Sequence, residues 1–108
     1  HDELMEIFLK NPYIPIFIAG DLNDLPWSDT LSKLSEEQFI NSGSYDNLNE
    51  QYSYIFEGNA QQLDYILINK NLVDGIMQAR FIHINTIKDY KEQLSDHDPF
   101  YLEFRLSP

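Results

Sequence analysis

The stretch "IFIAGDLNDLP" at residues 16–26 ends an apolar run with a cluster of polar side chains. Asp21, Asn23 and Asp24 follow the run within four positions. Asp and Asn are common turn residues, and this interpretation suits Asp24. At the rigid end of a strand, however, a carboxylate can bind an attacking water or a hard cation. An amide can donate a hydrogen bond to a phosphate oxygen, so Asp21 and Asn23 are candidates for phosphate chemistry.

Two further stretches carry the side chains that this chemistry still needs. Asp64 lies inside the apolar run "QLDYILI", and Asp96 and His97 stand together in "SDHDP". An imidazole held by a carboxylate can transfer a proton or stabilise charge on a phosphate. Each residue taken alone is more often structural. Together with Asp21 and Asn23, they form the set required for metal-assisted phosphodiester hydrolysis.

For the other histidines, for Trp27 and for Asp98 and Pro99, the sequence favours structural roles. His83 lies in an apolar stretch and is predicted to pack, and His1 stands at the start of the chain. Trp27 could stack on a substrate, but we expect it to anchor a loop beneath the following helix. Asp98 and Pro99 complete the acidic motif and are assigned no chemistry.

The composition is that of a globular domain or part of one. The chain has 108 residues, of which 43% are apolar and 14% aromatic, and this excludes a disordered protein. It has no cysteine, which excludes disulfides, thiolate catalysis and Cys-ligated zinc sites. No apolar stretch approaches the ~20 residues that span a bilayer, and the first ten residues show no secretory signal.

The charge is strongly acidic, at −11, with seven basic residues against 18 acidic ones. Tight, sequence-independent DNA binding depends on basic side chains, so the overall charge argues against it. A phosphodiester substrate remains compatible with the charge, because acids that hold a divalent cation present a locally positive site.

The first third of the chain predicts a helix, a strand and a second helix. Residues 2–10 have helical apolar spacing, which Pro12 ends. Residues 14–19 are short, apolar and rich in Ile, which suits a strand covered on both faces. After a loop at 20–27, Ser28 predicts an N-cap with two leucines of the helix facing inward.

The remainder predicts mainly strands. "SEEQ" is a second capping pattern, and a polar, exposed loop follows at 41–51. Four segments have the alternation or aromatic content of strands, and these are residues 52–56, 62–68, 78–85 and 100–106. The turn at 57–59 predicts that the first two of them form a hairpin. Residues 69–75 predict a turn or a single helical turn, and residues 86–98 a polar loop.

Taken in order, "GDLND.P", "LDYIL" and "SDHDP" resemble motifs of the endonuclease/exonuclease/phosphatase superfamily. This superfamily includes pancreatic-type deoxyribonucleases, abasic-site endonucleases, sphingomyelinases and inositol-polyphosphate 5-phosphatases. The stretch "YSYIFEGNAQQLDYILI" is most similar to predicted bacterial extracellular nucleases of the superfamily. The resemblance implies a hydrolase in an extracellular or periplasmic location. The composition leaves the cytoplasm open as well.

The resemblance also implies a role for each candidate. Asp21 would position or deprotonate the attacking water, and Asn23 would hydrogen-bond the phosphate oxygens. Asp96 would be a ligand, direct or through water, of Mg²⁺ or of Mn²⁺ or Ca²⁺. His97 would contact the scissile phosphate, and Asp64 would hold its imidazole in one orientation.

The resemblance covers only the later part of the family pattern. The family fold is a four-layer α/β sandwich, and its N-terminal half brings a metal-binding Asn and Glu that no position here matches. We therefore expect residues 1–108 to be a single partial domain, the C-terminal half of an α/β (α+β) sandwich with a mixed, mostly antiparallel sheet and short helices. One Asp is too few ligands for Mg²⁺, so we expect the isolated chain to be weak or inactive. A half-sandwich would also expose an apolar face that invites self-association.

The sequence leaves three functions open. The leading hypothesis is a segment of a divalent-metal-dependent phosphodiesterase, a nuclease whose substrate is nucleic acid. The second is a phosphatase or phospholipase-type esterase of the same superfamily, which would differ in substrate loops such as residues 41–51. The third is a binding or structural module that keeps the fold without catalysis.

Overall fold

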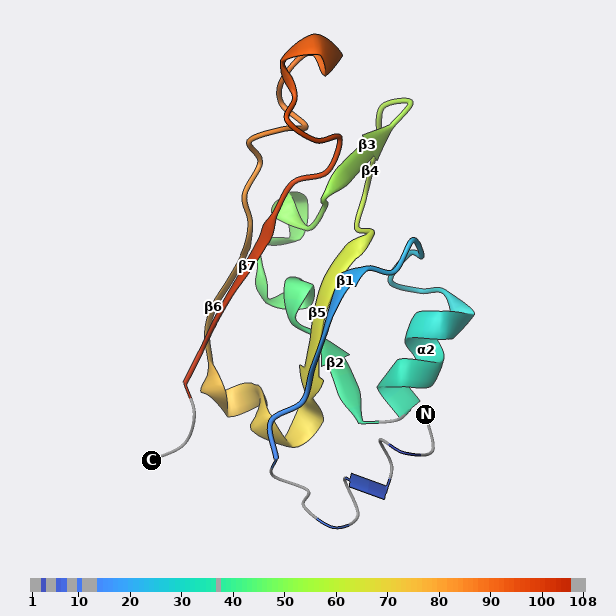
Figure 1. The fold of residues 1–108 in the computed structure, drawn as a ribbon, viewed down its shortest axis with the longest axis vertical. Helices are drawn as coiled ribbons and strands as arrows, with labels where there is room; N and C mark the ends of the chain where they lie inside the picture. The colour runs from blue at the N-terminus through green and yellow to red at the C-terminus, as the bar shows by residue number, and fades with distance from the viewer. Residues whose placement is uncertain (1–2, 4–5, 8–9, 11–13, 37, 106–108) are drawn as a thin grey trace.

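The computed structural model describes residues 3, 6–7, 10, 14–36 and 38–105, which form an α+β fold of antiparallel sheets and short helices (Figure 1). Of the helix predicted at residues 2–10, the four described residues are helical, and the others lie outside the described residues. Among the described residues, no helix has the length and apolar character needed to cross a membrane.

The central sheet has three strands in the order β1-β5-β2, all antiparallel to their neighbours. These strands are β1 (Phe17–Asp21), β5 (Asp64–Asn69) and β2 (Phe39–Asn41). The middle strand, β5, is almost wholly buried. Its position follows from its nearly continuous apolar sequence, because a strand with a neighbour on each side and a layer on each face has little polar surface to present.

One face of the central sheet is covered by the helix α2 (Asp29–Glu36). Ser28 Oγ accepts a hydrogen bond from the Leu31 backbone N–H at 3.3 Å, which confirms the predicted N-cap. Leu31 and Leu34 face the sheet, as predicted. The buried cluster beneath the helix consists of Leu31, Phe39, Tyr65 and Leu67.

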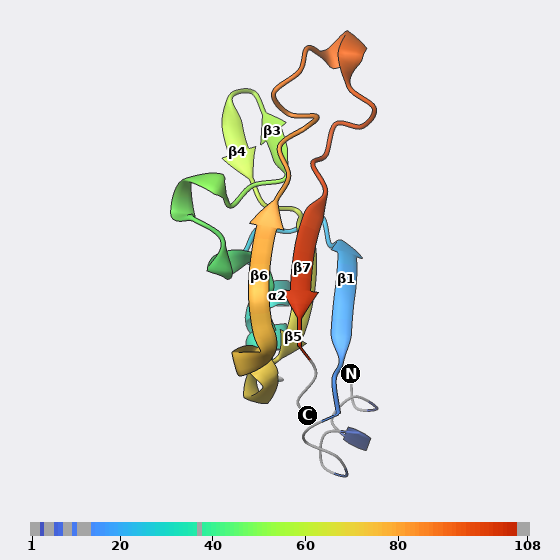
Figure 2. The same ribbon diagram turned by 90° about the vertical axis from the view of Figure 1, so that its left-hand side faces the viewer.

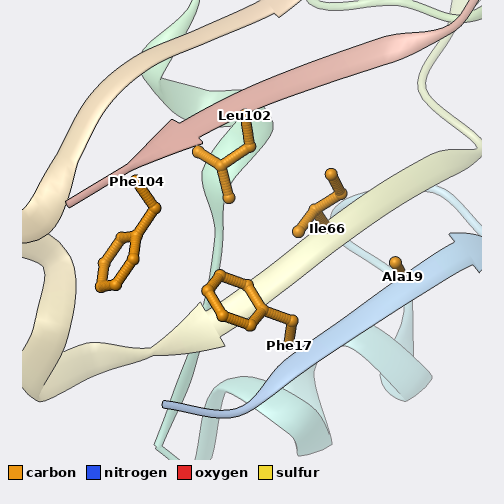
Figure 3. A pocket seen from close by; sticks show the side chains of 5 residues that line it. All are labelled: Phe17, Ala19, Ile66, Leu102 and Phe104. Atoms are coloured by element: carbon orange, nitrogen blue, oxygen red, sulfur yellow. The ribbon is translucent and has the colours of Figure 1, made fainter. Parts of the chain in front are cut away.

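The other face lies against a two-stranded ribbon of β6 (Ile76–Phe81) and β7 (Phe100–Phe104) (Figures 1 and 2). The strand predicted at residues 100–106 is thus confirmed over Phe100–Phe104, and Leu106, the last residue of its predicted alternation, lies outside the described residues. Between the ribbon and the sheet is an apolar opening of about 460 Å³, shown in Figure 3. It is lined by Phe17, Ala19, Ile66, Leu102 and Phe104. Self-association through this opening stays a prediction.

A small separate hairpin pairs β3 (Tyr54–Phe56) with β4 (Asn59–Gln61). The predicted turn is confirmed, with positive φ at Glu57 and Gly58. The predicted partner is wrong, because residues 62–68 do not return along β3. Only three residues after the tight turn, Asn59–Gln61, pair with β3. The apolar run that follows buries more apolar surface between β1 and β2.

Other predicted boundaries differ from the structure. β1 begins and ends later than predicted and is an exposed edge strand, so the expectation that both faces are covered is wrong. "SEEQ" starts no helix. Gln38 has φ +79°, and β2 follows immediately because the buried Phe39 is needed in the core. The strand predicted at 78–85 is β6, which ends before His83.

Trp27 is not the predicted anchor, because 78% of its surface is exposed. Leu22 and Leu34, rather than Trp27, pack against the buried cluster beneath α2.

Within the described residues, four 3₁₀ helices connect these elements, and they are η1 (Ser42–Tyr45), η2 (Leu48–Glu50), η3 (Lys70–Gly75) and η4 (Tyr90–Glu92). The third confirms the predicted helical turn at residues 69–75. The first begins in the loop predicted to be exposed, yet Ser42 and Gly43 are buried there. The last lies in the predicted polar loop before β7.

Asn69 fixes the end of the central sheet that lies away from the polar motifs. Its buried side chain accepts a hydrogen bond from the Ile16 N–H and donates one to the Ile14 carbonyl, each at 2.7 Å. These bonds tie the chain entering β1 to the last residue of β5. They hold the antiparallel register that pairs Phe17 with Ile68.

Candidate active site

The same register places two carboxylates side by side at the opposite end of the sheet. Asp21 is the last residue of β1, and Asp64, the first residue of β5, is its direct partner. Like charges that face each other across two strands destabilise a sheet unless a positive group lies near. The Asn23 N–H donates to Asp21 Oδ1 at 2.8 Å, with φ +54° at Asn23, and so orients that carboxylate.

His97 brings the positive group. The loop before β7 places its Nδ1 2.5 Å from Asp64 Oδ2, and its ring lies 5.0 Å from the ring of Tyr54 on β3. A carboxylate can only accept, so Nδ1 carries the proton of this bond. The other ring nitrogen, Nε2, is then the one that can exchange a proton with a substrate. Nε2 lies 3.8 Å from Oδ1 of Asp96.

The surroundings favour the charged form of this imidazole. Burial by itself lowers the pKa of His97. The hydrogen bond and charge of Asp64, together with the charges of Asp21 and Asp96, outweigh burial and raise the pKa above its ordinary value. The ring is 23% exposed, so solvent and substrate can reach it.

The donor atoms at this edge fit a cation. The potential ligand atoms of Asp21, Asp64 and His97 lie within 4.8 Å of one another. The two carboxylates can bind a cation, whereas His97 can do so only in its neutral form. Asp96 adds a fourth polar group at the rim, with 62% of its side chain exposed. Three carboxylates near one imidazole leave excess negative charge, which a divalent ion would offset.

A comparison with family models bears on what this site does. The family model for the endonuclease/exonuclease/phosphatase family matches residues 6–97. The chain belongs to the endonuclease/exonuclease/phosphatase family. The family includes metal-dependent nucleases and phosphatases, acts on phosphodiester substrates and generally depends on divalent metal ions. A comparison with curated proteins gave no match.

Within this family member, the structure gathers most of the residues that the sequence singled out. Asp21, Asp64 and His97 meet at one edge of the central sheet. Asp96 lies beside His97, and Asn23 contacts Asp21 through its backbone while its side chain is exposed. Their catalytic and metal-binding roles stay predictions.

Ser53 is a residue of the site that the sequence did not reveal. It is fully buried, and its Oγ accepts hydrogen bonds from the Leu63 and Asp64 N–H groups, both at 3.1 Å. Its carbonyl accepts from the Asp98 N–H at 2.7 Å. Ser53 therefore links the backbone of Asp64 to the segment that carries His97. A serine within an aromatic run gives no signal of this.

Asp98 was assigned no chemistry, and the structure gives it a supporting position. The residue is only 2% exposed, and its Oδ1 accepts from the Asn85 and Thr86 N–H groups at 2.8 and 2.9 Å. The Asn85 amide in turn donates to the His97 carbonyl at 2.8 Å. The buried carboxylate thus fixes both ends of the loop that leads to the imidazole.

Proposed function

We propose that this chain carries the phosphate-handling residues of a divalent-metal-dependent phosphodiesterase, a nuclease that hydrolyses nucleic acid. The observation that supports it most is the His97–Asp64 pair lying beside Asp21, which is fixed in register opposite Asp64. Further metal ligands would come from an N-terminal half of the domain, as the family resemblance implies.

Each residue then has a chemical task. Asp21, held by the Asn23 N–H, accepts the proton of a water whose oxygen attacks phosphorus. The imidazolium of His97 donates from Nε2 to a phosphate oxygen on which charge develops, and the Asn23 amide donates to another. Asp64 keeps the ring oriented. The bond from phosphorus to the leaving ester oxygen breaks, that oxygen takes a proton from solvent water, and Asp21 returns its proton to solvent.

The metal would be held on the exposed side of this cluster. Asp64 and His97 are already bonded to each other, whereas Asp96 is exposed and suits an oxygen-coordinated ion such as Mg²⁺, with Mn²⁺ or Ca²⁺ as alternatives. A bound divalent ion supplies positive charge that offsets the carboxylates and polarises the phosphate.

One observation favours a second candidate, a phosphatase or phospholipase-type esterase with the same site. The charge of −11 repels a long polyanion more strongly than a small phosphate ester. A non-catalytic module on this fold would instead show no turnover of any phosphate ester.

The test uses the full-length protein with plasmid DNA, RNA, inositol phosphates and sphingomyelin, each with Mg²⁺ and with a chelator. We expect nucleic acid to be cleaved with Mg²⁺ and to stay intact with chelator. Asp21→Asn should lower turnover by about 10²–10⁴-fold, while Asp74→Asn, an exposed acid in η3, should leave it as in the wild type. Turnover of inositol phosphate or sphingomyelin alone would select the second candidate. Full activity in Asp21→Asn would overturn the mechanism.

A further inference from the structure

A pocket of about 300 Å³ adjoins the candidate active site. It is lined by Tyr54 and Ile55 of β3 and by Thr86, Gln93 and Asp96 of the loop before β7. Two of these residues also border His97. The Tyr54 ring lies 5.0 Å from the His97 ring, and Asp96 Oδ1 lies 3.8 Å from His97 Nε2. A chemical group held in the pocket would therefore be close to a phosphate at His97.

The walls of the pocket are held in place by contacts that need no ligand. The Thr86 N–H donates to the buried carboxylate of Asp98 at 2.9 Å. Gln93 Nε2 donates to the Lys88 carbonyl at 3.1 Å and so braces the loop across from β3. A pocket whose walls are already fixed loses little conformational entropy when it binds a ligand.

The lining selects among the substrates that the family could use. It combines an aromatic ring, an aliphatic side chain, a hydroxyl, an amide and a carboxylate. None of the described lining residues is basic, so a group bearing several phosphates would meet no counter-charge there. A neutral planar ring with hydrogen-bonding edges fits better. It can stack on the tyrosine, and the amide of Gln93 can both donate to it and accept from it.

We propose that this pocket binds the nucleoside next to the scissile phosphate, with Tyr54 and Gln93 as the residues that determine this specificity. The substrate is then a nucleotide chain rather than an inositol polyphosphate or a phospholipid. The inference rests on the proposed function, because it takes the reacting phosphate to lie at His97. The volume of about 300 Å³ is at the lower end of the range for small-molecule pockets, which suits one nucleoside.

The first experiment compares two diesters with the same leaving group, thymidine 5′-(p-nitrophenyl phosphate) and methyl p-nitrophenyl phosphate, in the full-length protein with Mg²⁺. The measured quantity is the ratio of their kcat/KM values. We expect Tyr54→Leu to lower this ratio about tenfold and Gln93→Ala to lower it about threefold. Tyr54→Phe, which keeps the ring, should restore most of the ratio.

The matched control is Gln78→Ala, which removes an exposed glutamine on β6 outside this pocket and should keep the wild-type ratio. An unaltered ratio in both Tyr54→Leu and Gln93→Ala would overturn the nucleoside assignment. This holds even if kcat/KM falls for both diesters, because equal losses would show damage to the site rather than lost recognition.

The second experiment needs no turnover and so separates the two proposals. Uncharged thymidine, or myo-inositol as the comparison, is titrated without metal while the methyl resonances of Ile55 and Thr86 are followed by NMR. We expect both resonances to shift with thymidine and to shift less in Gln93→Ala. This result supports the pocket even if no diester is hydrolysed, an outcome that would reject only the proposed function. No shift with thymidine, or an equal shift with inositol, would reject the pocket as a nucleoside site.

Discussion

Two histidines in the described part of the chain each share a hydrogen bond between Nδ1 and an aspartate, and the two pairs differ at the second ring nitrogen. His97 Nδ1 lies 2.5 Å from Asp64, and His83 Nδ1 lies 2.8 Å from Asp98. At His83, Nε2 lies 2.9 Å from a carboxylate oxygen of Glu50 and 3.1 Å from its carbonyl. At His97, Nε2 lies 3.8 Å from a carboxylate oxygen of Asp96, which is beyond hydrogen-bond distance.

Under the proposed function, this difference separates a structural pair from a pair that takes part in the chemistry. The His83 ring is stacked on Tyr52 at 4.0 Å, has both nitrogens engaged and is 12% exposed. Such a ring crosslinks the loops on either side of it but has no nitrogen to offer a substrate. His97 has the same residue type and the same kind of partner, and its Nε2 remains available. The pairing alone therefore does not mark a catalytic histidine.

The sharpest test of this comparison replaces each imidazole in turn. His97→Ala should lower phosphodiester turnover of the full-length protein by about 10²–10⁴-fold, because the proton donor is lost. His83→Ala should lower it by less than about tenfold, through a less well-fixed loop, while it lowers the melting temperature. Turnover would be measured at saturating substrate, with circular dichroism as the check on folding. Equal losses of turnover in the two variants would remove the distinction.

For the two aspartates, the larger loss of stability is expected at Asp98, the partner of His83, and the smaller loss at Asp64, the partner of His97. Asp98→Asn should lower the free energy of unfolding by about 3 kcal/mol, because a buried carboxylate that accepts from Thr86, Asn85 and His83 is replaced by a group that cannot accept at both ends. Asp64→Asn should lower it by about 1 kcal/mol or less, since that pair is partly exposed. Urea unfolding measures both. A larger loss for Asp64→Asn would contradict the assignment of the structural role to Asp98.

The smallest expected effect is a difference in how the stability contributed by each pair depends on pH. The raised pKa of His97 stabilises the folded state below its unfolded value of about 6.5, and this stabilisation is lost as pH rises through the folded pKa. Burial raises the pKa of Asp98, but its hydrogen bonds from Thr86, His83 and the backbone outweigh burial and lower it. That stabilisation is present above about pH 3.9 and is lost as pH falls through the folded pKa.

The difference in unfolding free energy between wild type and His97→Ala should therefore shrink by about 1 kcal/mol or less between pH 6 and pH 9. The difference between wild type and Asp98→Asn should hold over that range and shrink only in acid. Urea unfolding at pH 3, 6 and 9 provides the comparison. If both differences changed in the same pH range, the two pairs would not be electrostatically distinct.

The sequence predicted which candidate residues lie close together better than it predicted the strand partners. Asp21, Asp64 and His97 could be identified because motifs record residue type and order, and α2 could be placed because its cap and its apolar spacing are local. β2 and the pairing of β5 could not, since they depend on which distant strands bury Phe39 and Leu67.

The supporting residues were hidden for a similar reason. Ser53 acts through its Oγ and its carbonyl on segments far along the chain, and nothing in the neighbouring residues indicates those partners. The exposure of Trp27 was missed because the volume beneath α2 depends on how leucines from two segments pack. The residues next to Trp27 in the sequence do not indicate which side chains fill that volume.

The buried amide of Asn69 has a consequence for anyone who redesigns this site. Side chains alternate between the faces of a sheet, so sliding β1 past β5 by one position would move Asp21 off its partner and turn it to the wrong side. The clamp that prevents this sliding sits at the far end of the strand. An engineer who exchanged Asn69 for a better-packing aliphatic residue could thus misalign the proposed catalytic groups without touching any of them.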